Sequence, residues 1–164
     1  MNIVDVAEHN LDVYMNLAQG YESEFSAITR KKPNERGLFE LDTQIEGNVK
    51  GLLLLVEGAP AGLAAIAAKP ENRYEVCEFY VVPYFRKQSW GAHFAHAIWR
   101  RFPGRWEVKQ IAGAEYATIF WRKVIGDFTH SAYTEDQYED AYWGPVIRQQ
   151  FNSSYNGVGS VNRR

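Results

Sequence analysis

Apolar residues recur at helical spacing near the start of the chain. Between Ala7 and Ser26 the large side chains lie mostly three or four residues apart, which is the period of one helix face. This spacing predicts a helix over 7–26, with Gly20 as a point where it could divide into two. The following segment, Thr29–Gln44, contains a proline, a glycine and mixed charge, and is predicted to be a loop.

Strand patterns follow this loop. Lys50–Glu57 and Gly62–Lys69 are apolar and flank the turn-forming residues Gly58–Ala61, which predicts a β-hairpin. Tyr74–Val82 is rich in aromatic and β-branched residues and stops at Pro83. Because proline cannot donate a hydrogen bond to a neighbouring strand, this segment is predicted to be a strand that closes there.

The rest of the chain alternates helical and strand patterns. The predicted order is a helix at 89–102, a strand at 105–111, a helix at 114–125 and two closing strands at 128–134 and 141–151. Together the elements predict one α/β domain, with a mixed, mostly antiparallel sheet flanked by helices. That domain spans 1–151, and the Gly-, Ser- and Asn-rich residues 152–164 are predicted to be a flexible tail.

Composition supports a single folded domain. The 164 residues are 46% hydrophobic and 23% charged, which excludes intrinsic disorder of the body. The longest apolar run, Gly51–Val56, is far shorter than the roughly 18 residues of a membrane helix, and the first ten residues lack a signal-peptide pattern. With Cys77 as the only cysteine, an intrachain disulfide is excluded, so a cytoplasmic protein without a membrane partner is expected.

The formal net charge of −2 hides a division along the chain. Residues 86–123 contain eight basic and two acidic side chains and carry +6, whereas the remainder carries −8. The asymmetry indicates an anionic partner near residues 86–123, although a solvated basic face explains many such clusters.

The strand, basic turn and helix at residues 74–102 carry the most specific chemistry. A helix amino terminus presents unpaired N–H groups and the positive end of a dipole, and so binds anions. Arg86 and Lys87 add positive charge to the loop before this helix, while Gly91 and Ala92 are small enough for a ligand to approach the backbone. The loop therefore has the outline of a pyrophosphate site, but has neither the P-loop nor the dinucleotide-binding pattern.

In these residues the chain resembles the GCN5-related N-acetyltransferases (the GNAT family). The family motif, Arg/Gln-x-x-Gly-x-Gly/Ala after a strand that ends near a proline, matches Arg86-Lys87-Gln88-Ser89-Trp90-Gly91, with serine at the first glycine position. The stretch Ala117–Ile125 looks like the family's Ala-x-x-Phe-Tyr helix. This stretch, together with Gly144-Pro145-Val146, is similar to a bacterial subgroup of predicted acetyltransferases.

The resemblance implies a GNAT-like sheet of six to seven strands and acetyl-CoA (coenzyme A) as the cofactor, without a metal. It implies that backbone groups of Val81 and Val82 pair with the pantetheine amides. The other cofactor-binding residues that it implies are Arg86, Lys87, Gln88, Ser89, Trp90, Gly91, Ala92 and Trp121. The implied activity is that of an acyltransferase, in which a primary amine of a small molecule or peptide attacks the acetyl thioester directly.

Direct transfer needs a base for the amine and a proton donor for the thiolate. The resemblance implies that Glu78 is the base, and burial would raise its pKa toward neutrality. Many relatives donate from a tyrosine at the position of Trp121, whose indole cannot do so. The role then falls to Tyr80, Tyr116 or solvent, and Tyr80 is the candidate taken here together with Glu78. The family's asparagine is also replaced, by Ala114.

Other interpretations stay open at this point. Glu78 could be a structural partner of an arginine or a backbone N–H, Cys77 is expected to be a core thiol facing away from Glu78, and His93 with His96 lacks the carboxylate of a metal site. The chain could also be a non-catalytic acyl-CoA sensor or interaction module. A nucleic-acid partner is disfavoured, because coenzyme A explains the same charges with fewer assumptions. A homodimer is left open.

Overall fold

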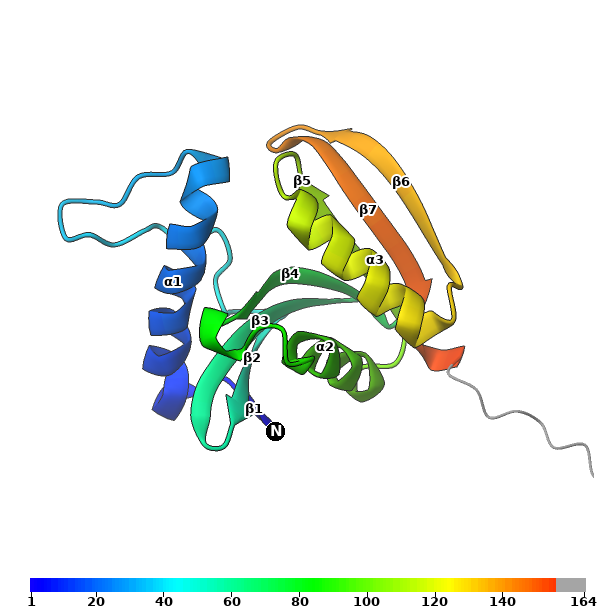
Figure 1. Cartoon of the computed structure of the whole chain (residues 1–164), viewed down its shortest axis with the longest axis horizontal. Helices are drawn as coiled ribbons and strands as arrows, with labels where there is room; N and C mark the ends of the chain where they lie inside the picture. The colour runs from blue at the N-terminus through cyan, green and yellow to red at the C-terminus, as the bar shows by residue number, and fades with distance from the viewer. Residues whose placement is uncertain (156–164) are drawn as a thin grey trace, which may run out of the picture.

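The computed structural model of the protein describes residues 1–155. These residues form one seven-stranded sheet with three α-helices and three 3-10 helices (Figure 1). The strands are β1 (Asn2–Asp5), β2 (Val49–Val56), β3 (Ala59–Lys69), β4 (Arg73–Val81), β5 (Arg105–Ile111), β6 (Tyr133–Asp140) and β7 (Gly144–Asn152). The helices are η1 (Glu8–Asn10), α1 (Leu11–Thr29), η2 (Pro83–Phe85), α2 (Trp90–Arg101), α3 (Glu115–Thr129) and η3 (Ser153–Tyr155).

The sheet has the order β1-β2-β3-β4-β5-β7-β6, and its one parallel pair is β4 with β5. This pair is joined by α2, as a parallel connection requires. The architecture confirms the predicted α/β domain with a mixed, mostly antiparallel sheet, here of seven strands.

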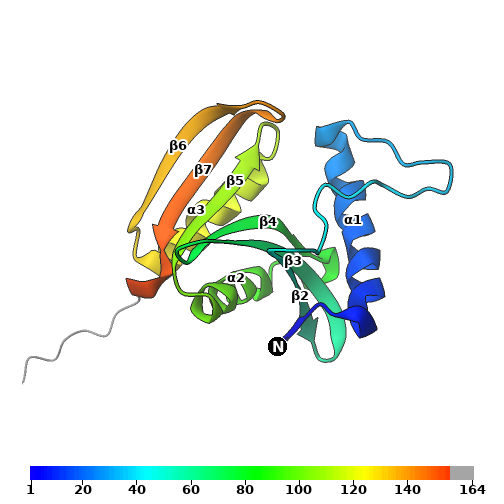
Figure 2. The same cartoon turned by 180° about the vertical axis from the view of Figure 1, so that it is seen from behind.

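The two faces of the sheet are covered by different helices. Side chains alternate between the faces along a strand, so Leu52 and Leu54 of β2 pack in the cluster with α2 and α3, whereas Leu53 packs under α1. Figures 1 and 2 show α1 on one side of the sheet and α2 and α3 on the other. The continuous apolar run of β2 is explained by burial on both faces.

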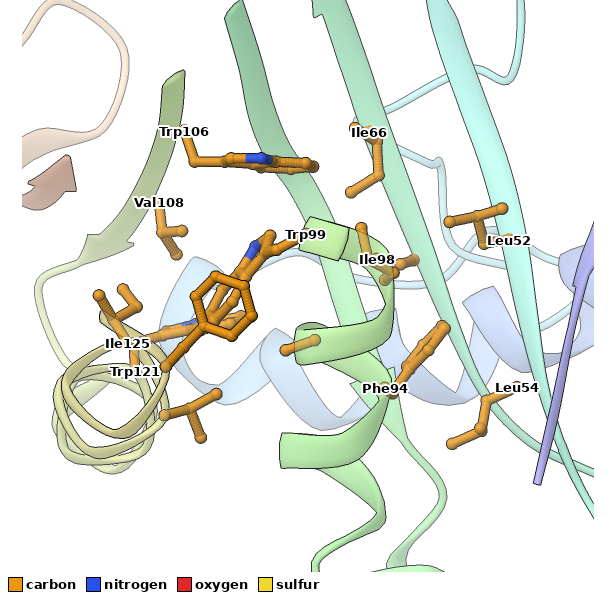
Figure 3. Packing of buried hydrophobic residues seen from close by; sticks show 14 of the residues in the cluster. Leu52, Leu54, Ile66, Phe94, Ile98, Trp99, Trp106, Val108, Trp121 and Ile125 are labelled. Atoms are coloured by element: carbon orange, nitrogen blue, oxygen red, sulfur yellow. The ribbon is translucent and has the colours of Figure 1, made fainter. Parts of the chain in front are cut away.

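Aromatic side chains dominate the core between the sheet and α2 and α3 (Figure 3). Trp99 of α2 and Trp106 of β5 are each 1% exposed, and Trp121 of α3 is 6% exposed. Trp99 also packs edge-on against Phe151 of β7, with ring centroids 4.7 Å apart. Such rings bury large apolar areas, so this core fixes α2 and α3 against both halves of the sheet.

A β-bulge interrupts β4 at Cys77. Ile66 of β3 pairs with Val76 and the preceding Ala65 pairs with Glu78, so Cys77 is skipped in the register. The skip reverses the alternation of side chains. Phe79 consequently shares the α2 and α3 face with Val76, while Glu78 lies on the face covered by α1.

Beyond the bulge, β4 separates from β5. The two strands pair over only four residues, Arg73–Val76 with Arg105–Val108, although both strands continue further. The sheet thus divides into a β1–β4 half and a β5–β7–β6 half, and Figures 1 and 2 show β4 and β5 diverging. We call the place where these two strands diverge the opening. Within residues 1–155, the part of β4 from Cys77 onward has no partner strand on that edge.

Several predicted elements are confirmed, with adjusted boundaries. The hairpin of β2 and β3 turns at Glu57-Gly58, both with positive φ, rather than across four residues, because a two-residue turn of this kind matches the twist of the strands. Helix α1 is continuous through Gly20. A Cβ at Gly20 would lie 3.3 Å from the Tyr80 hydroxyl, so the glycine allows close packing on β4 and does not end the helix.

The predicted strand at 128–134 is wrong. Helix α3 continues to Thr129, because Phe128 packs in the core one helical turn after Val124, and His130 ends the helix in a left-handed conformation. Strand β6 instead covers the acidic residues 133–140. As an edge strand it is held by β7 and by side-chain pairs such as Arg148 with Asp136, which a search for apolar alternation does not find.

The ends of the chain also differ from expectation. Strand β1 was not predicted, since four residues are too few to show a period. At the other end β7 extends to Asn152, and the Ser153 backbone N–H donates to the Gly104 carbonyl at 2.8 Å. The domain therefore continues past the predicted boundary at Phe151. The rest of the predicted flexible tail, 156–164, lies outside the described residues.

Candidate functional site

Glu78 lies at the opening between the two halves of the sheet. It follows the last β4 residue that pairs with β5 by two positions, on the face covered by α1, and it is 9% exposed. Its partners are hydroxyls and not a cation. Thr43 Oγ1 donates to Glu78 Oε1 at 2.7 Å, and the Tyr21 hydroxyl also hydrogen-bonds the carboxylate. The structure thus gives Glu78 neither the arginine nor the backbone N–H partner that was left open.

Burial is the main influence on the ionisation of Glu78. It raises the pKa of the carboxyl to about 7, against the opposing effect of the hydrogen bonds from Tyr21 and Thr43. The negative charges of Glu22 and Asp42 raise it further. A carboxylate with this pKa can accept and release a proton near neutral pH.

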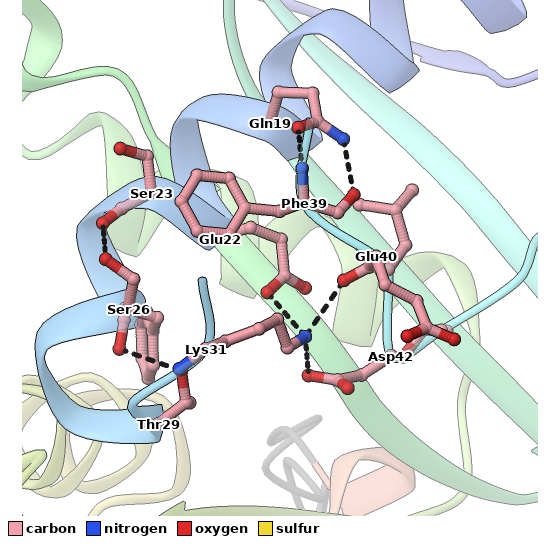
Figure 4. Close-up of polar contacts among 12 residues, drawn as sticks. Gln19, Glu22, Ser23, Ser26, Thr29, Lys31, Phe39, Glu40 and Asp42 are labelled. Carbon is pink, nitrogen blue, oxygen red and sulfur yellow. Dashed lines mark hydrogen bonds and ion pairs between the residues drawn. The ribbon is translucent and has the colours of Figure 1, made fainter. Parts of the chain in front are cut away.

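Lys31 neutralises those two acidic neighbours. Its Nζ lies 2.9 Å from a carboxylate oxygen of Glu22 on α1 and 2.9 Å from one of Asp42 in the loop between α1 and β2. It also donates to the carbonyl of Glu40 (Figure 4). Glu22 is 2% exposed, so its charge would be costly without this partner. Glu22 and Asp42, the acidic side chains near Glu78, are therefore already paired with Lys31.

An aromatic row crosses the opening from β4 to α3. The Tyr80 ring packs edge-on against Tyr21, whose ring lies 4.8 Å from Phe25, and Phe25 in turn lies 6.4 Å from Tyr116. Tyr80 shares the α1 face with Glu78, and its hydroxyl lies against Gly20. Burial raises its pKa above that of an ordinary tyrosine, which makes it a weaker acid.

Arg86 is turned toward α1. Its guanidinium makes two hydrogen bonds of 2.8 Å to the carboxylate of Glu24, and its Nε donates to the Val81 carbonyl at 2.8 Å. The same group lies over the Tyr80 ring. All three nitrogens are thus engaged within the fold, contrary to the expectation that Arg86 faces a pyrophosphate.

The loop before α2 brings Lys87 and Ser89 into left-handed backbone conformations, with φ of 60° and 63°. Ser89 occupies the position where the family motif has glycine. The backbone there keeps the left-handed conformation that glycine adopts freely, although serine adopts it at a steric cost. The first bond of α2 joins the His93 N–H to the Ser89 carbonyl. Within residues 1–155 the N–H groups of Trp90, Gly91 and Ala92 have no partner, as a helix amino terminus leaves them.

Gly91 also has a packing role. A Cβ on this residue would lie 3.1 Å from the Phe120 ring of α3, so its small size lets α2 approach α3. The amide of Gln88 donates to the Tyr84 carbonyl at 3.1 Å, which closes the loop on itself.

The free edge of β4 offers one residue for backbone pairing. The Val82 N–H donates to Ala61 of β3, and its carbonyl accepts from the Phe85 N–H. Both polar groups of Val82 are therefore used within the fold, and its pairing with a pantetheine amide stays a prediction. Because backbone groups alternate in direction along a strand, the polar groups of Val81 face the opening, where Arg86 already contacts the carbonyl.

Trp121 lies in the core, and its role as a cofactor residue stays a prediction. It is 6% exposed and packs edge-on against Phe79 at 4.8 Å. Trp90 also packs against the core, and its indole N–H is buried without a partner within the described residues.

Cys77 and the two histidines have ordinary environments. Burial is the main reason that the pKa of the Cys77 thiol is raised to about 11, so it stays protonated. The expectation that it faces away from Glu78 assumed unbroken alternation, which the bulge removes. His96 bonds the Val124 carbonyl through Nε2 at 2.9 Å.

Sequence reasoning missed Tyr21, Thr43 and Glu24 as partners of site residues. Thr43 lies 35 residues from Glu78, in a loop without a pattern, and Glu24 lies 62 residues from Arg86. Glu24 was visible only as one of several acidic residues. No local signal marks these contacts, since they depend on how α1 and its loop fold over the sheet.

Comparison with solved structures shows that the chain has the fold of the GNAT acetyltransferases. The ribosomal-protein-S18-alanine N-acetyltransferase from Escherichia coli superposes with a TM-score of 0.61 at 13% identity, over 96% of this chain and 97% of that one. An aminoglycoside 6′-N-acetyltransferase complexed with coenzyme A gives 0.63 at 10% identity, over 93% and 97%.

An acetyltransferase from Bacillus subtilis in complex with CoA gives a TM-score of 0.55 at 13% identity, over 92% of this chain and 97% of that one. No protein-family model and no curated sequence matches the chain. At these identities the resemblance is established for the fold. Among residues 1–155, no helix is long and apolar enough to cross a membrane.

The left-handed conformation of Ser89 predicts that Ser89→Gly stabilises the protein. Glycine adopts this conformation without the steric cost borne by serine, so the free energy of unfolding should rise by about 1 kcal/mol in urea titrations. Ser23→Gly, inside α1, is the matched control and should lower it by roughly 0.5 kcal/mol. A Ser89→Gly chain that is no more stable than the original would contradict this backbone conformation.

The raised pKa of Glu78 predicts that the effect of Glu78→Gln on the free energy of unfolding depends on pH. The folded protein holds the Glu78 proton more tightly than the unfolded chain, so that contribution to stability is complete below about pH 4.5 and is lost as pH rises through about 7. Glutamine does not titrate. Between pH 5 and pH 8, stability relative to the original should shift by about 3 kcal/mol in favour of the variant. An equal difference at both pH values would show that Glu78 titrates normally.

Proposed function

We propose that this protein is an acetyl-CoA-dependent N-acetyltransferase that modifies a primary amine. The observation that carries the proposal is Glu78: a buried carboxylate with a pKa of about 7, at the opening between β4 and β5. A carboxylate that only stabilised the fold would be expected to pair with a cation or a backbone N–H, and Glu78 does neither. The GNAT fold of the chain supports the same assignment.

The residues present fit coenzyme A. The unpaired N–H groups of Trp90, Gly91 and Ala92 would hold the pyrophosphate, because the start of a helix favours anions. Lys87 would add a charge there, with the side chains of Gln88 and Ser89 in the same loop. Val81 would pair with a pantetheine amide at the free edge of β4.

We give Arg86 a different role from the phosphate contact that the family resemblance implies. Its bonds to Glu24 and to the Val81 carbonyl tie the loop to α1, so we assign it to the support of the binding loop. Lys87 is the side chain that we assign to the phosphates.

Acetyl-CoA, when bound, would supply the acetyl group as a thioester whose carbonyl carbon an amine can attack. An amine is protonated at neutral pH and cannot attack until it loses a proton. Glu78 accepts that proton, directly or through a water molecule, because its ionised form is populated around pH 7. The carbon–nitrogen bond then forms, the carbon–sulfur bond breaks, and the sulfur takes up a proton.

Two tyrosine hydroxyls are our candidates to supply that last proton. Tyr80 shares the face of Glu78, and Tyr116 on α3 ends the aromatic row across the opening. Trp121 is excluded as the acid, because an indole N–H does not give up its proton at neutral pH and the side chain is buried in the core. Tyr80 is our candidate for the donor, and Tyr80→Phe compared with Tyr116→Phe distinguishes the two.

Binding is tested by calorimetry with coenzyme A. The original chain should bind, and Lys87→Glu should weaken affinity by about five- to tenfold, since a negative charge replaces a positive one beside the phosphates. Lys50→Glu on β2 makes the same change of charge away from this loop and should leave affinity unchanged. Absence of binding to the original chain would refute the proposal, and equal losses in both variants would place the phosphates elsewhere.

Transfer is tested by incubating the protein with acetyl-CoA and pooled amines while the free thiol is measured. Release should depend on an amine, and kcat/KM should rise tenfold per pH unit below about pH 7 and level off above it, since only ionised Glu78 accepts a proton. Glu78→Gln should lower the rate by about 100-fold. Glu75→Gln, on the same strand but outside the opening, should retain it.

The alternative is a non-catalytic acyl-CoA sensor. The observation in its favour is Trp121, which occupies the core where relatives carry a tyrosine donor. The thiol assay separates the two functions. Tight binding of coenzyme A with no amine-dependent release, in a chain where Glu78→Gln changes nothing, identifies the sensor.

A further inference from the structure

The loop between α1 and β2 is held against α1 by two sets of polar contacts. The side-chain amide of Gln19 exchanges two hydrogen bonds with the backbone of Phe39, at 2.8 and 2.9 Å. The Lys31 ammonium joins Glu22 of α1 to Asp42 and to the carbonyl of Glu40 (Figure 4). These contacts fix the backbone immediately before Thr43.

Thr43 uses this fixed position to reach the carboxylate of Glu78. Its Oγ1 lies 2.7 Å from Oε1, across 35 residues of sequence. Thr43 and Glu78 line a cavity of about 10 Å³ with Tyr14 and Tyr21, which has room for about one water molecule. The carboxylate therefore meets solid packing on this side, with little space in which to turn.

Among the charged and titratable groups around Glu78, the hydroxyl groups are the ones that stabilise its ionised form. Helix α1 contributes Tyr14, Tyr21 and Glu22, the loop contributes Asp42 and Lys31, and β4 contributes Cys77. Burial raises the pKa of Tyr14, of Tyr21 and of the thiol, so these groups stay neutral. Lys31 is engaged by the two acids. Two hydroxyl donors, from Thr43 and Tyr21, remain for the carboxylate.

We propose that Thr43 is a positioning residue for Glu78: its hydroxyl, fixed by the Lys31-fastened loop, holds Oε1 and orients the carboxylate toward the opening. This rests on the proposed function of Glu78 as a base. The loop then has a defined part in the reaction, since the group that accepts the amine proton depends on a donor outside the sheet. A hydrogen bond to the ionised form lowers the pKa of a carboxyl, so Thr43 also sets the pH at which the base is ready.

The variant that tests this is Thr43→Val, which removes the donor while keeping the branched shape. The midpoint of the kcat/KM profile should rise by about one pH unit, and activity should return above the new midpoint. Thr43→Ser, which keeps the hydroxyl, should restore the original midpoint. Thr129→Val is the control, because Thr129 is also buried but donates to Ile125 within α3; its midpoint should be unchanged.

A second readout separates this proposal from the proposed function. The Glu78 carboxyl carbon, labelled with ¹³C, is titrated by NMR in the original chain and in each variant. An upward shift in Thr43→Val that Thr43→Ser reverses supports the positioning role even in a chain that acetylates no amine. An unshifted titration in folded Thr43→Val overturns it, whatever the activity.

Should Thr43→Val fail to fold, Thr43→Ala and Tyr21→Phe carry the test. Each removes one hydroxyl donor from Glu78, and each should raise the NMR midpoint. If Tyr21→Phe raises it and Thr43→Ala leaves it in place, Tyr21 alone stabilises the carboxylate and the role of Thr43 is refuted.

Discussion

The skipped residue at Cys77 is the constraint on which the rest of the site depends. A regular β4 would place Glu78 on the same face as Val76, among the tryptophans of the core, where no hydroxyl meets it. The bulge turns Glu78 toward α1 instead and bends the strand away from β5. One change of register therefore produces both the opening in the sheet and the carboxylate beside it.

Placing a carboxylate under a helix has an energetic cost that the surroundings offset only in part. Hydrogen bonds to a charged group contribute roughly 1.5–3 kcal/mol each, and Glu78 receives them from Thr43 and Tyr21. Lys31 offsets part of the repulsion that Glu22 and Asp42 exert on Glu78. The balance leaves Glu78 less acidic than in water yet ionisable at neutral pH, which is a property of the whole α1 face and not of the strand.

Much of this fold was visible in the sequence, because its central elements have strong periods. The strand, basic loop and helix at 74–102 were placed nearly to the residue, and Glu78 was named from them. The edge strand β6 was misplaced, since its residues are held by pairing and salt bridges and carry no apolar alternation. The support of Glu78 by Thr43 was beyond prediction for a physical reason: this contact between a loop and a distant strand exists only after α1 and the loop that follows it have packed on the sheet.

The charge division along the chain changes its meaning once the pairs are known. Five of the eight basic residues in the segment 86–123 pair with acids outside it: Arg86 with Glu24, Arg101 with Asp5, Lys109 with Glu75, Arg122 with Glu135 and Lys123 with Asp127. Ion pairs in the folded protein thus cancel most of this charge asymmetry. An electrostatic field calculated from all eight basic charges would be too strong. Lys87, Arg100 and Arg105 have no ion pair within residues 1–155.

Of these three, Lys87 alone adjoins the amino terminus of α2, since Arg100 lies near the other end of that helix and Arg105 begins β5. Attraction for an anion at this loop therefore comes from one lysine and the helix terminus, not from a basic surface. Under the proposed function, this loop would recognise a phosphate by the directions of its N–H groups more than by charge. Of the eight basic charges that produce the asymmetry along the sequence, only one therefore lies beside the amino terminus of α2.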